Sequence, residues 1–202
     1  MLRTHSCGEV RASHAGRHVT VAGWVHRRRD HGGLLFVDVR DREGRIQVVF
    51  DPDTAPDVAA AARGLGQEWV VAVEGLVRLR PEGQANPDMA TGDVEVLAAE
   101  LRVLNASVTP PFEVARDLEV TEGQRLRYRY LDLRRERMQE NLRLRHEATH
   151  FARQFLHDRG FLDVETPVLL KTTPEGARDF LVPSRLHAGR FYALPQSPQQ
   201  MK

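Results

Sequence analysis

Two polar segments in the last third of the sequence carry residue types that hold a charged small molecule. Residues 172–179 read Thr-Thr-Pro-Glu-Gly-Ala-Arg-Asp, a loop interrupted by Pro and Gly in which Glu175 can hold an ammonium group. In residues 197–202, Gln199 can bind an amino or carboxyl group, and Lys202 can pair with a carboxylate. Together they predict a polar ligand pocket with the loop at 172–179 as its lid. Taken alone, each segment also fits a solvated surface turn.

A second set of candidate binding residues lies within the first fifty positions. Phe36 offers a stacking platform for an unpaired base, and Gln47 offers a donor and an acceptor to a base edge. Arg29 can hold a phosphate or read a guanine-like edge. Any one of them alone is more often a core or surface residue. Gathered on one face of a sheet, the three predict binding of single-stranded nucleic acid.

The elements that must position Arg29, Phe36 and Gln47 follow from alternating apolar residues and turn sequences. We expect a short helix behind Pro56 and strands at 19–25, 34–39, 45–50, 69–79, 94–97 and 101–104. The order strand–strand–strand–helix–strand–strand is typical of the five-stranded Greek-key barrel called the OB-fold, which binds single strands on one face. An unrelated small barrel is the alternative.

A different pattern follows the barrel. Pro110 and Pro111 mark a linker, and a helix is expected to begin near Thr121. A longer amphipathic helix at 137–159 is expected to stop at Gly160, ahead of a strand at 161–167. We therefore predict an α+β chain with a barrel at 1–105, a hinge at 106–136 and a further domain at 137–202.

Composition limits the class of protein. No run of eighteen apolar residues predicts a transmembrane helix, and the N-terminus lacks the apolar core of a signal peptide. The lone cysteine, Cys7, favours a reducing cytoplasm, and we expect it to be buried and inert. The net charge is only +1, yet eight arginines face three acids between Arg125 and Arg145. Such arginine clusters suit phosphate contacts or, equally, solvated helix faces.

At the level of motifs, the chain closely resembles the N-terminal part of bacterial aspartyl-tRNA synthetases, which are class II enzymes. The matching segments are spread over the whole chain: 23–25, 27–30, 38–44, 128–134, 160–167, 173–179 and 192–199. Lysyl and asparaginyl synthetases share the barrel and the strand that ends at Pro167. The sequence Thr-Pro-Glu-Gly-Ala-Arg-Asp belongs to the aspartyl type.

The resemblance implies a role for each part of the chain. The barrel would bind the tRNA anticodon through Arg29, Phe36 and Gln47, and residues near 106–135 would touch the tRNA stem. The helix at 137–159 and the strand ending at Pro167 would form the homodimer motif.

For the small-molecule site, the resemblance implies L-aspartate as the ligand. The lid would consist of Thr173, Pro174, Glu175, Gly176, Ala177, Arg178 and Asp179. Glu175 would lie near the amino group of the aspartate. The other wall would comprise Ser197, Gln199, Gln200, Met201 and Lys202. Lys202 would bind the side-chain carboxylate, so that aspartate is selected over neutral asparagine.

For the reaction, the resemblance implies that a full-length parent activates L-aspartate with ATP and Mg²⁺ and passes it to the 3′ end of tRNA. The catalytic residues are expected after Lys202, no metal site is expected within the chain, and we expect the 202 residues alone to bind tRNA weakly without aminoacylating it. A stand-alone OB-fold module that binds tRNA or single strands without catalysis is the rival hypothesis.

Two positions bear on tRNA specificity. His31 stands where many strictly tRNA(Asp)-specific members carry Leu, and Gly83 stands where they often carry a bulkier or charged residue. Some members with His and Gly at these positions also charge tRNA(Asn). Relaxed specificity and neutral loop drift are equally compatible with the two residues.

Overall fold

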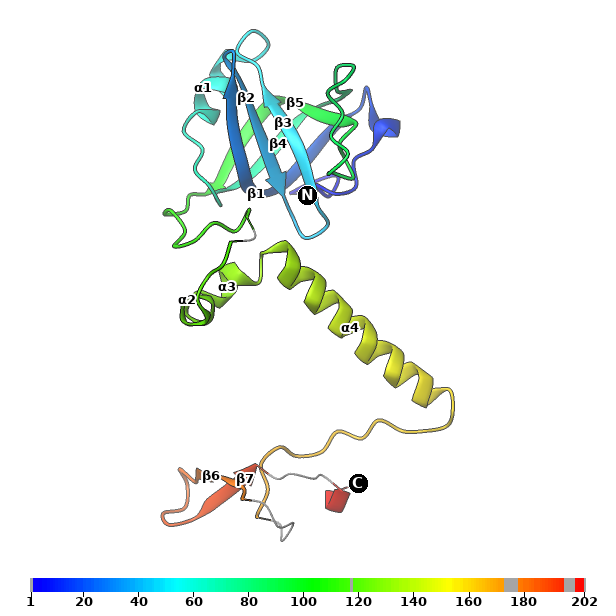
Figure 1. Cartoon of the computed structure of the whole chain (residues 1–202), viewed down its shortest axis with the longest axis vertical. Helices are drawn as coiled ribbons and strands as arrows, with labels where there is room; N and C mark the ends of the chain where they lie inside the picture. Colours follow the sequence, from blue (N-terminus) through cyan, green and yellow to red (C-terminus); the bar gives the residue numbers. More distant parts are fainter. Residues whose placement is uncertain (1, 117, 173–177, 195–198, 202) are drawn as a thin grey trace. The chain divides into compact units, whose positions relative to one another are not determined.

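A computed structural model describes residues 2–116, 118–172, 178–194 and 199–201. The elements in chain order begin with the short 3₁₀ helix η1 (Ala12–His14) and the strands β1 (His18–His31), β2 (Leu34–Arg40) and β3 (Arg45–Phe50). Helix α1 (Pro56–Ala62) and strands β4 (Val70–Leu79) and β5 (Val94–Asn105) complete the first domain (Figure 1). Helices α2 (Glu122–Arg127), α3 (Arg129–Asp132) and α4 (Glu136–His157) follow, then β6 (Phe180–Pro183), β7 (Phe191–Leu194) and η2 (Gln199–Met201).

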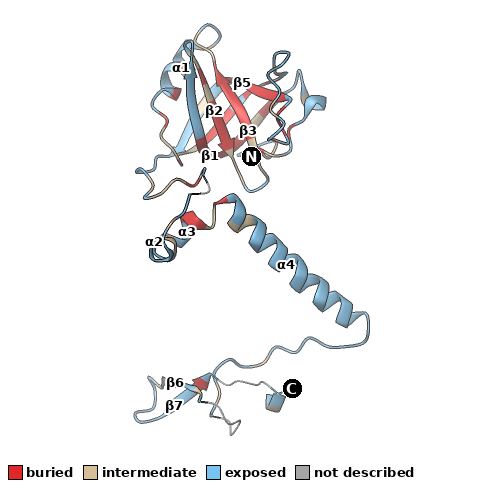
Figure 2. Ribbon diagram, viewed as in Figure 1, coloured by how far each residue is buried: buried red, intermediate tan, exposed pale blue. Residues whose placement is uncertain are grey.

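The five N-terminal strands close into a barrel in the order β1-β2-β3-β5-β4, with β3 and β5 parallel and the other pairs antiparallel. Side chains alternate along each strand, so one set fills the barrel and the other faces outward. The filled interior is built mainly from β-branched residues, and Figure 2 shows this buried material concentrated in the barrel strands. Its members include Val21, Val37, Val39, Ile46, Val48, Val71, Val73 and Val96. This topology confirms the predicted OB-fold.

Two strand boundaries differ from the expected ones. The segments 94–97 and 101–104 belong to a single strand, β5, whose pairing with β4 shifts register between Glu74 and Gly75. Strand β1 continues to His31, because Gly32 and Gly33 turn the chain directly back into Leu34. Both glycines have positive φ (62° and 90°), which is the backbone that a tight two-residue hairpin requires. The hairpin therefore extends the sheet beyond the barrel core.

The helices after the barrel begin and end close to their predicted positions. The Thr121 hydroxyl accepts a hydrogen bond from the Gln124 amide and caps α2. Helix α4 occupies 136–157, and the chain leaves it at Gly160, where the φ angle is 82°. The predicted apolar stripe of α4, which includes Leu144, Phe151 and Phe155, is exposed to solvent.

The prediction of a strand at 161–167 is wrong: the structure describes all of these residues and none of them lies in a strand. These residues form no strand ladder, and Phe161, Leu162 and Val164 are exposed. Alternating apolar residues adopt a strand only where a partner strand satisfies their backbone groups, and no described segment pairs with them. The nearest pairing begins at Leu170, which forms a bridge with Ala193 on β7. Strand β7 itself pairs with β6 and agrees with the strand-like character of 190–194.

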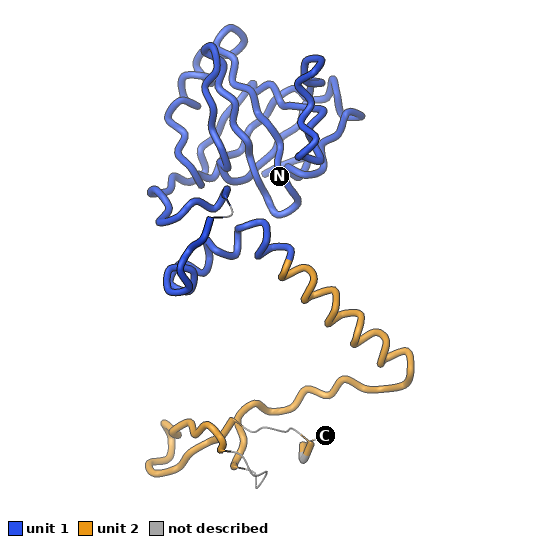
Figure 3. The backbone as a smooth tube through the Cα atoms, viewed as in Figure 1, with its two compact units in different colours: residues 1–140 blue, residues 141–202 orange. Residues whose placement is uncertain are grey.

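The chain divides into two compact units, residues 1–140 and 141–202 (Figure 3). The hinge helices α2 and α3 fall in the first unit together with the barrel. Among the described residues, no helix is both long and apolar enough to cross a membrane.

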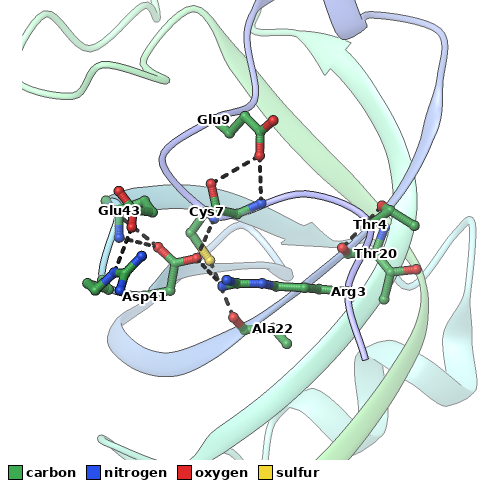
Figure 4. Close-up of polar contacts among 11 residues, drawn as sticks. Arg3, Thr4, Cys7, Glu9, Thr20, Ala22, Asp41 and Glu43 are labelled. Atoms are coloured by element: carbon green, nitrogen blue, oxygen red, sulfur yellow. Dashed lines mark hydrogen bonds and ion pairs between the residues drawn. The ribbon is translucent and has the colours of Figure 1, made fainter. Parts of the chain in front are cut away.

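Cys7 anchors the N-terminal segment to the barrel. Its amide donates to the Asp41 carboxylate at 2.8 Å, and the same carboxylate accepts from Arg3 at 2.8 Å (Figure 4). Asp41 also accepts from the amides of Glu43 and Gly44, so one side chain closes its own turn and holds the N-terminal segment. Burial, followed by the negative charge of Asp41, raises the pKa of the Cys7 thiol far above its usual range. The expectation that Cys7 is buried is confirmed, and its low reactivity stays a prediction.

Candidate nucleic-acid interface

The strand register brings the predicted binding residues onto one outward face of the barrel. Phe36 on β2 lies opposite Arg29 on β1 and opposite Val49 on β3. Two positions further along β2, Asp38 lies opposite Gln47. The intervening residues of β2 point into the core, so Phe36 is half-buried on the outer surface rather than inside. Arg29, Phe36 and Gln47 are therefore neighbours, as expected from the sequence.

A chain of charge-assisted hydrogen bonds fixes the polar members of this face. Nη2 of Arg29 donates to Oε1 of Gln47 at 2.9 Å and to Oδ1 of Asp38 at 3.2 Å. Nε2 of Gln47 donates to Oε2 of Glu95 at 2.7 Å, and Oε1 of Glu95 accepts from Nε of Arg78 at 2.8 Å. A guanidinium only donates and a carboxylate only accepts, so the amide of Gln47 has a single orientation that satisfies both partners.

Burial differs sharply along this chain of contacts. Gln47, Asp38 and Glu95 are nearly inaccessible, whereas the side chains of Arg29 and Arg78 keep 44% and 39% of their surface exposed. The buried acceptors hold the arginines in place, and the arginines present the remaining donors to solvent. With Phe36 beside them, the face offers a stacking ring and oriented cations, which is the combination that single-stranded nucleic acids bind.

Gln47 has a more restricted geometry than the sequence suggested. Its amide oxygen and nitrogen already bond to Arg29 and Glu95 and the residue is only 5% exposed, so a base edge reaches the remaining lone pair or N–H only if neighbouring side chains move. Glu95 and Arg78 did not emerge from the sequence. The available signal was a glutamate between Val94 and Val96 on a strand, an outward position where a charge is buried only if it is paired.

His31 and Gly83 are exposed, the first beside a hairpin turn and the second within a turn. His31 is the last residue of β1 and pairs with Leu34 across the hairpin. Gly83 lies in the loop between β4 and β5 with a φ angle of 78°, and no atom lies within 4 Å of where a Cβ would stand. The space would admit a larger side chain, but the backbone conformation favours glycine. Gly83 therefore has a conformational reason to be glycine in addition to any role in specificity.

Arginines of the hinge gather around one buried acid. Asp132 is completely buried and accepts from Nη1 of Arg129 at 2.7 Å and Nε of Arg125 at 3.2 Å. Arg135 lies 3.6 Å from the same carboxylate and donates to the carbonyl of Leu118. Burial alone would raise the pKa of Asp132, but the hydrogen bonds and charges of Arg125 and Arg129 outweigh it and hold the pKa below its usual range. Three of the arginines between Arg125 and Arg145 therefore stabilise the hinge by contacting Asp132.

Most of the predicted aspartate site falls outside the described residues. Thr173, Pro174, Glu175, Gly176, Ala177, Ser197 and Lys202 are not among them. Arg178 is exposed and Asp179 is half-buried just before β6, while Gln199, Gln200 and Met201 form η2. Pro167 lies in the segment that forms no strand. Within the described ranges, no group of three or more His, Cys, Asp and Glu side chains is arranged to hold a metal ion.

Comparison with known proteins agrees with this architecture in both parts of the chain. Residues 19–104 match the family described as OB-fold nucleic acid binding domain, and residues 121–202 match tRNA synthetases class II (D, K and N). The structure is similar to asparaginyl-tRNA synthetase from Pyrococcus horikoshii complexed with asparaginyl-adenylate, with a TM-score of 0.83 and 26% identity. That similarity covers 100% of this chain and 44% of the other. The fold is therefore an OB-fold barrel followed by the start of a class II synthetase domain.

Among class II synthetases, the sequence relatives with high identity to this chain include aspartate–tRNA(Asp/Asn) ligases. The chain is 62% identical over 200 residues to aspartate–tRNA(Asp/Asn) ligase of Rubrobacter xylanophilus, which covers 99% of this chain and 33% of that protein. It is 56% identical over 200 residues to the ligase of the same name from Syntrophotalea carbinolica, covering 99% and 34%. Over nearly its whole length the chain is therefore similar to aspartate–tRNA(Asp/Asn) ligases, and it spans about a third of the length of these relatives.

Proposed function

We propose that the full-length parent of this chain is an aspartate–tRNA ligase. It activates L-aspartate with ATP to aspartyl-adenylate and transfers the aspartyl group to the 3′ end of tRNA(Asp). Identity of 62% to a ligase of that name supports the proposal. Mg²⁺ is the metal ion that the resemblance implies for the ATP step, where it would neutralise phosphate charge. The lone buried Cys7 and the class of enzyme are consistent with a cytoplasmic location.

Within the parent, the barrel is the anticodon-binding domain. The observation that carries this part of the proposal is the single outward face on which Phe36 stands opposite Arg29, with Asp38 and Gln47 holding the Arg29 guanidinium. Stacking of one unpaired base on an aromatic ring contributes about 1–3 kcal/mol. The exposed edge of Arg29 contributes a cation that needs little reorganisation on binding.

The acceptor tRNA includes tRNA(Asn) in this proposal. The support is the name of the two sequence relatives, tRNA(Asp/Asn) ligase, together with the exposed residues His31 and Gly83 of the barrel. Steady-state charging of purified tRNA(Asn) with radiolabelled aspartate by the full-length enzyme tests it. Charging of tRNA(Asn) at a rate comparable to that of tRNA(Asp) is expected, and no detectable charging would end the relaxed-specificity proposal.

The second unit contributes one wall of the aspartate site and part of a homodimer interface. Lys202 supplies the cation for the aspartate side chain, with Glu175 and Gln199 at the amino acid backbone. The exposed apolar side chains of α4, among them Leu144, Phe151 and Phe155, support the dimer role because such a stripe is normally covered by another surface.

Direct binding tests the role of the barrel. Fluorescence anisotropy with an anticodon stem–loop of tRNA(Asp), and with the same stem–loop carrying an unrelated anticodon, measures whether the 202-residue chain prefers the cognate loop. We expect at least ten-fold tighter binding of the cognate loop. Equal affinity for both loops would show that the barrel does not read the anticodon.

A further inference from the structure

Glu68 is a buried glutamate in a backbone conformation that glutamate rarely adopts. It precedes β4, is 2% exposed, and is the only described residue other than glycine with a positive φ angle, 60°. Its amide donates to the carbonyl of Val25 on β1 at 2.8 Å, so the barrel holds this backbone in place. Gly or Asn would adopt the same conformation with less strain, and a strained residue of this kind commonly serves a specific purpose.

The carboxylate of Glu68 joins the barrel to the hinge. It accepts from Nη2 of Arg40, on β2, at 3.0 Å and from Nη1 of Arg134, which follows α3, at 3.1 Å. The guanidinium of Arg134 also lies over the ring of Trp24 on β1, with 4.6 Å between its carbon and the ring centroid. Arg134 is thus held from one side by a buried anion and from another by an aromatic face.

The surroundings of Arg40 show why a negative charge is needed at Glu68: His26, the neighbour of Arg40 on the other side, is neutral. Nη1 of Arg40 contacts Nδ1 of His26 at 2.7 Å. A guanidinium can only donate, so His26 is the acceptor and is neutral. Two guanidinium groups therefore meet at this site with Glu68 as their shared, buried carboxylate. Removing its charge leaves two half-buried cations without the anion that holds them together.

The short hinge helices need contacts with other parts of the chain, such as the Glu68–Arg134 ion pair, to be stable. Helix α2 has 6 residues and α3 has 4, and isolated helices of that length are not stable in water. Asp132 gathers Arg125 and Arg129 within the hinge, but the Glu68–Arg134 pair crosses from the hinge to the barrel.

We propose that Glu68 is a positioning residue that fixes the hinge (residues 121–135) on the barrel through Arg134, so that the two bind tRNA as one preorganised surface. The first half concerns folding of this chain alone. Only the tRNA half rests on the proposed function, and the two halves are tested by separate measurements.

Hydrogen exchange followed by mass spectrometry tests the first half on the 202-residue chain. The informative variants are Glu68→Gly and Glu68→Asn, which keep a backbone-compatible residue but remove the carboxylate, and Arg134→Ala, which leaves the barrel turn untouched. We expect amides of 121–135 to exchange at least ten-fold faster in all three, while those of β4 keep their protection. Arg137→Ala, an exposed arginine outside these contacts, is the matched control and should change neither.

Unchanged exchange of 121–135 in Arg134→Ala would overturn the proposal, even if a Glu68 variant unfolds the barrel.

Anisotropy with a full tRNA(Asp) transcript and with its anticodon stem–loop tests the second half. Arg134→Ala should weaken binding of the full transcript about ten-fold and leave the stem–loop affinity unchanged. Faster hinge exchange with unchanged affinity for the transcript would reduce Glu68 to a purely structural residue and contradict its positioning role. Absence of RNA binding by the unsubstituted chain would overturn the proposed function and the tRNA half, while the exchange result would still decide the docking half.

Discussion

Arg29 and Gln47 meet through a 2.9 Å hydrogen bond although their strands, β1 and β3, are not neighbours. The bond passes over β2, the strand that lies between them and carries Phe36 and Asp38. The most exposed cation of the candidate RNA surface is therefore fixed by a residue from a third strand. This relationship makes the outer face of β1, β2 and β3 a preorganised unit rather than a set of independent side chains.

Gln47→Leu tests that unit. The substitution preserves the approximate volume but removes both hydrogen bonds, leaving the buried carboxylate of Glu95 with one donor fewer. We expect the free energy of unfolding to fall by about 1–3 kcal/mol, since a buried acceptor loses its partner. Affinity for an anticodon stem–loop should fall as well, because Arg29 is no longer oriented. Urea denaturation and anisotropy measure the two effects, and wild-type values in both would show that Gln47 does not organise the face.

His26 predicts a loss of stability in weak acid. Burial, followed by the charge of Arg40, lowers its pKa from 6.5 to about 4 in the folded chain. The unfolded state binds a proton below about pH 6.5 and the folded state only below about 4, so stability falls as the pH falls between those values. The total loss is about 3 kcal/mol. Denaturation at several pH values should show this slope, and His26→Asn, which cannot titrate, should remove most of it. An equal slope in the variant would assign the pH dependence to other groups.

Asp132 also loses its stabilising effect in acid, but its stabilised form is the charged one, whereas that of His26 is neutral. The pKa of Asp132 is held below the ordinary value by Arg125 and Arg129 against the effect of burial, so its stabilisation is complete above the unfolded pKa of about 3.9 and is lost as the pH falls through the folded value. Asp132→Asn removes the charge at every pH and takes the shared carboxylate away from the partly exposed Arg125 and Arg129, at a cost of about 1–3 kcal/mol. Hydrogen exchange should show the loss as faster exchange in residues 122–135. Full protection there at neutral pH would contradict the assignment.

Asp41→Ala should expose the N-terminal segment. The Asp41 carboxylate accepts from the amides of Cys7, Glu43 and Gly44, and its removal takes away the acceptor that joins the N-terminal segment to this turn. In the native chain Cys7 should react with a thiol reagent only slowly, because it is buried and its pKa is raised. The variant should react at least ten-fold faster at pH 7.5. Arg42→Ala, which changes a neighbouring exposed side chain, is the control. Equal rates in Asp41→Ala and the wild type would show that other contacts hold the segment.

The sequence alone predicted secondary structure correctly where the local residue pattern determines it. Alternation of apolar residues predicted the barrel strands, and Thr121 and Gly160 correctly marked the limits of the helical region. It failed at 161–167, because alternation cannot show whether a partner strand is present. It also missed Glu68, Glu95 and Arg134, whose contacts join residues distant in the chain. Such pairs depend on strand register, which a single sequence does not specify.

The outward face of the barrel as the anticodon-binding surface is tested most directly by Phe36→Ala and Arg29→Ala. Binding of a tRNA(Asp) anticodon stem–loop by the 202-residue chain is the measurement. Arg17→Ala, the loss of one exposed arginine just before the first residue of β1, is the matched control. Loss of a stacking ring should weaken binding about ten-fold or more, and loss of the oriented guanidinium by a similar factor. Arg17→Ala should change the affinity less than two-fold. Wild-type affinity in both Phe36→Ala and Arg29→Ala would show that this face does not bind the anticodon.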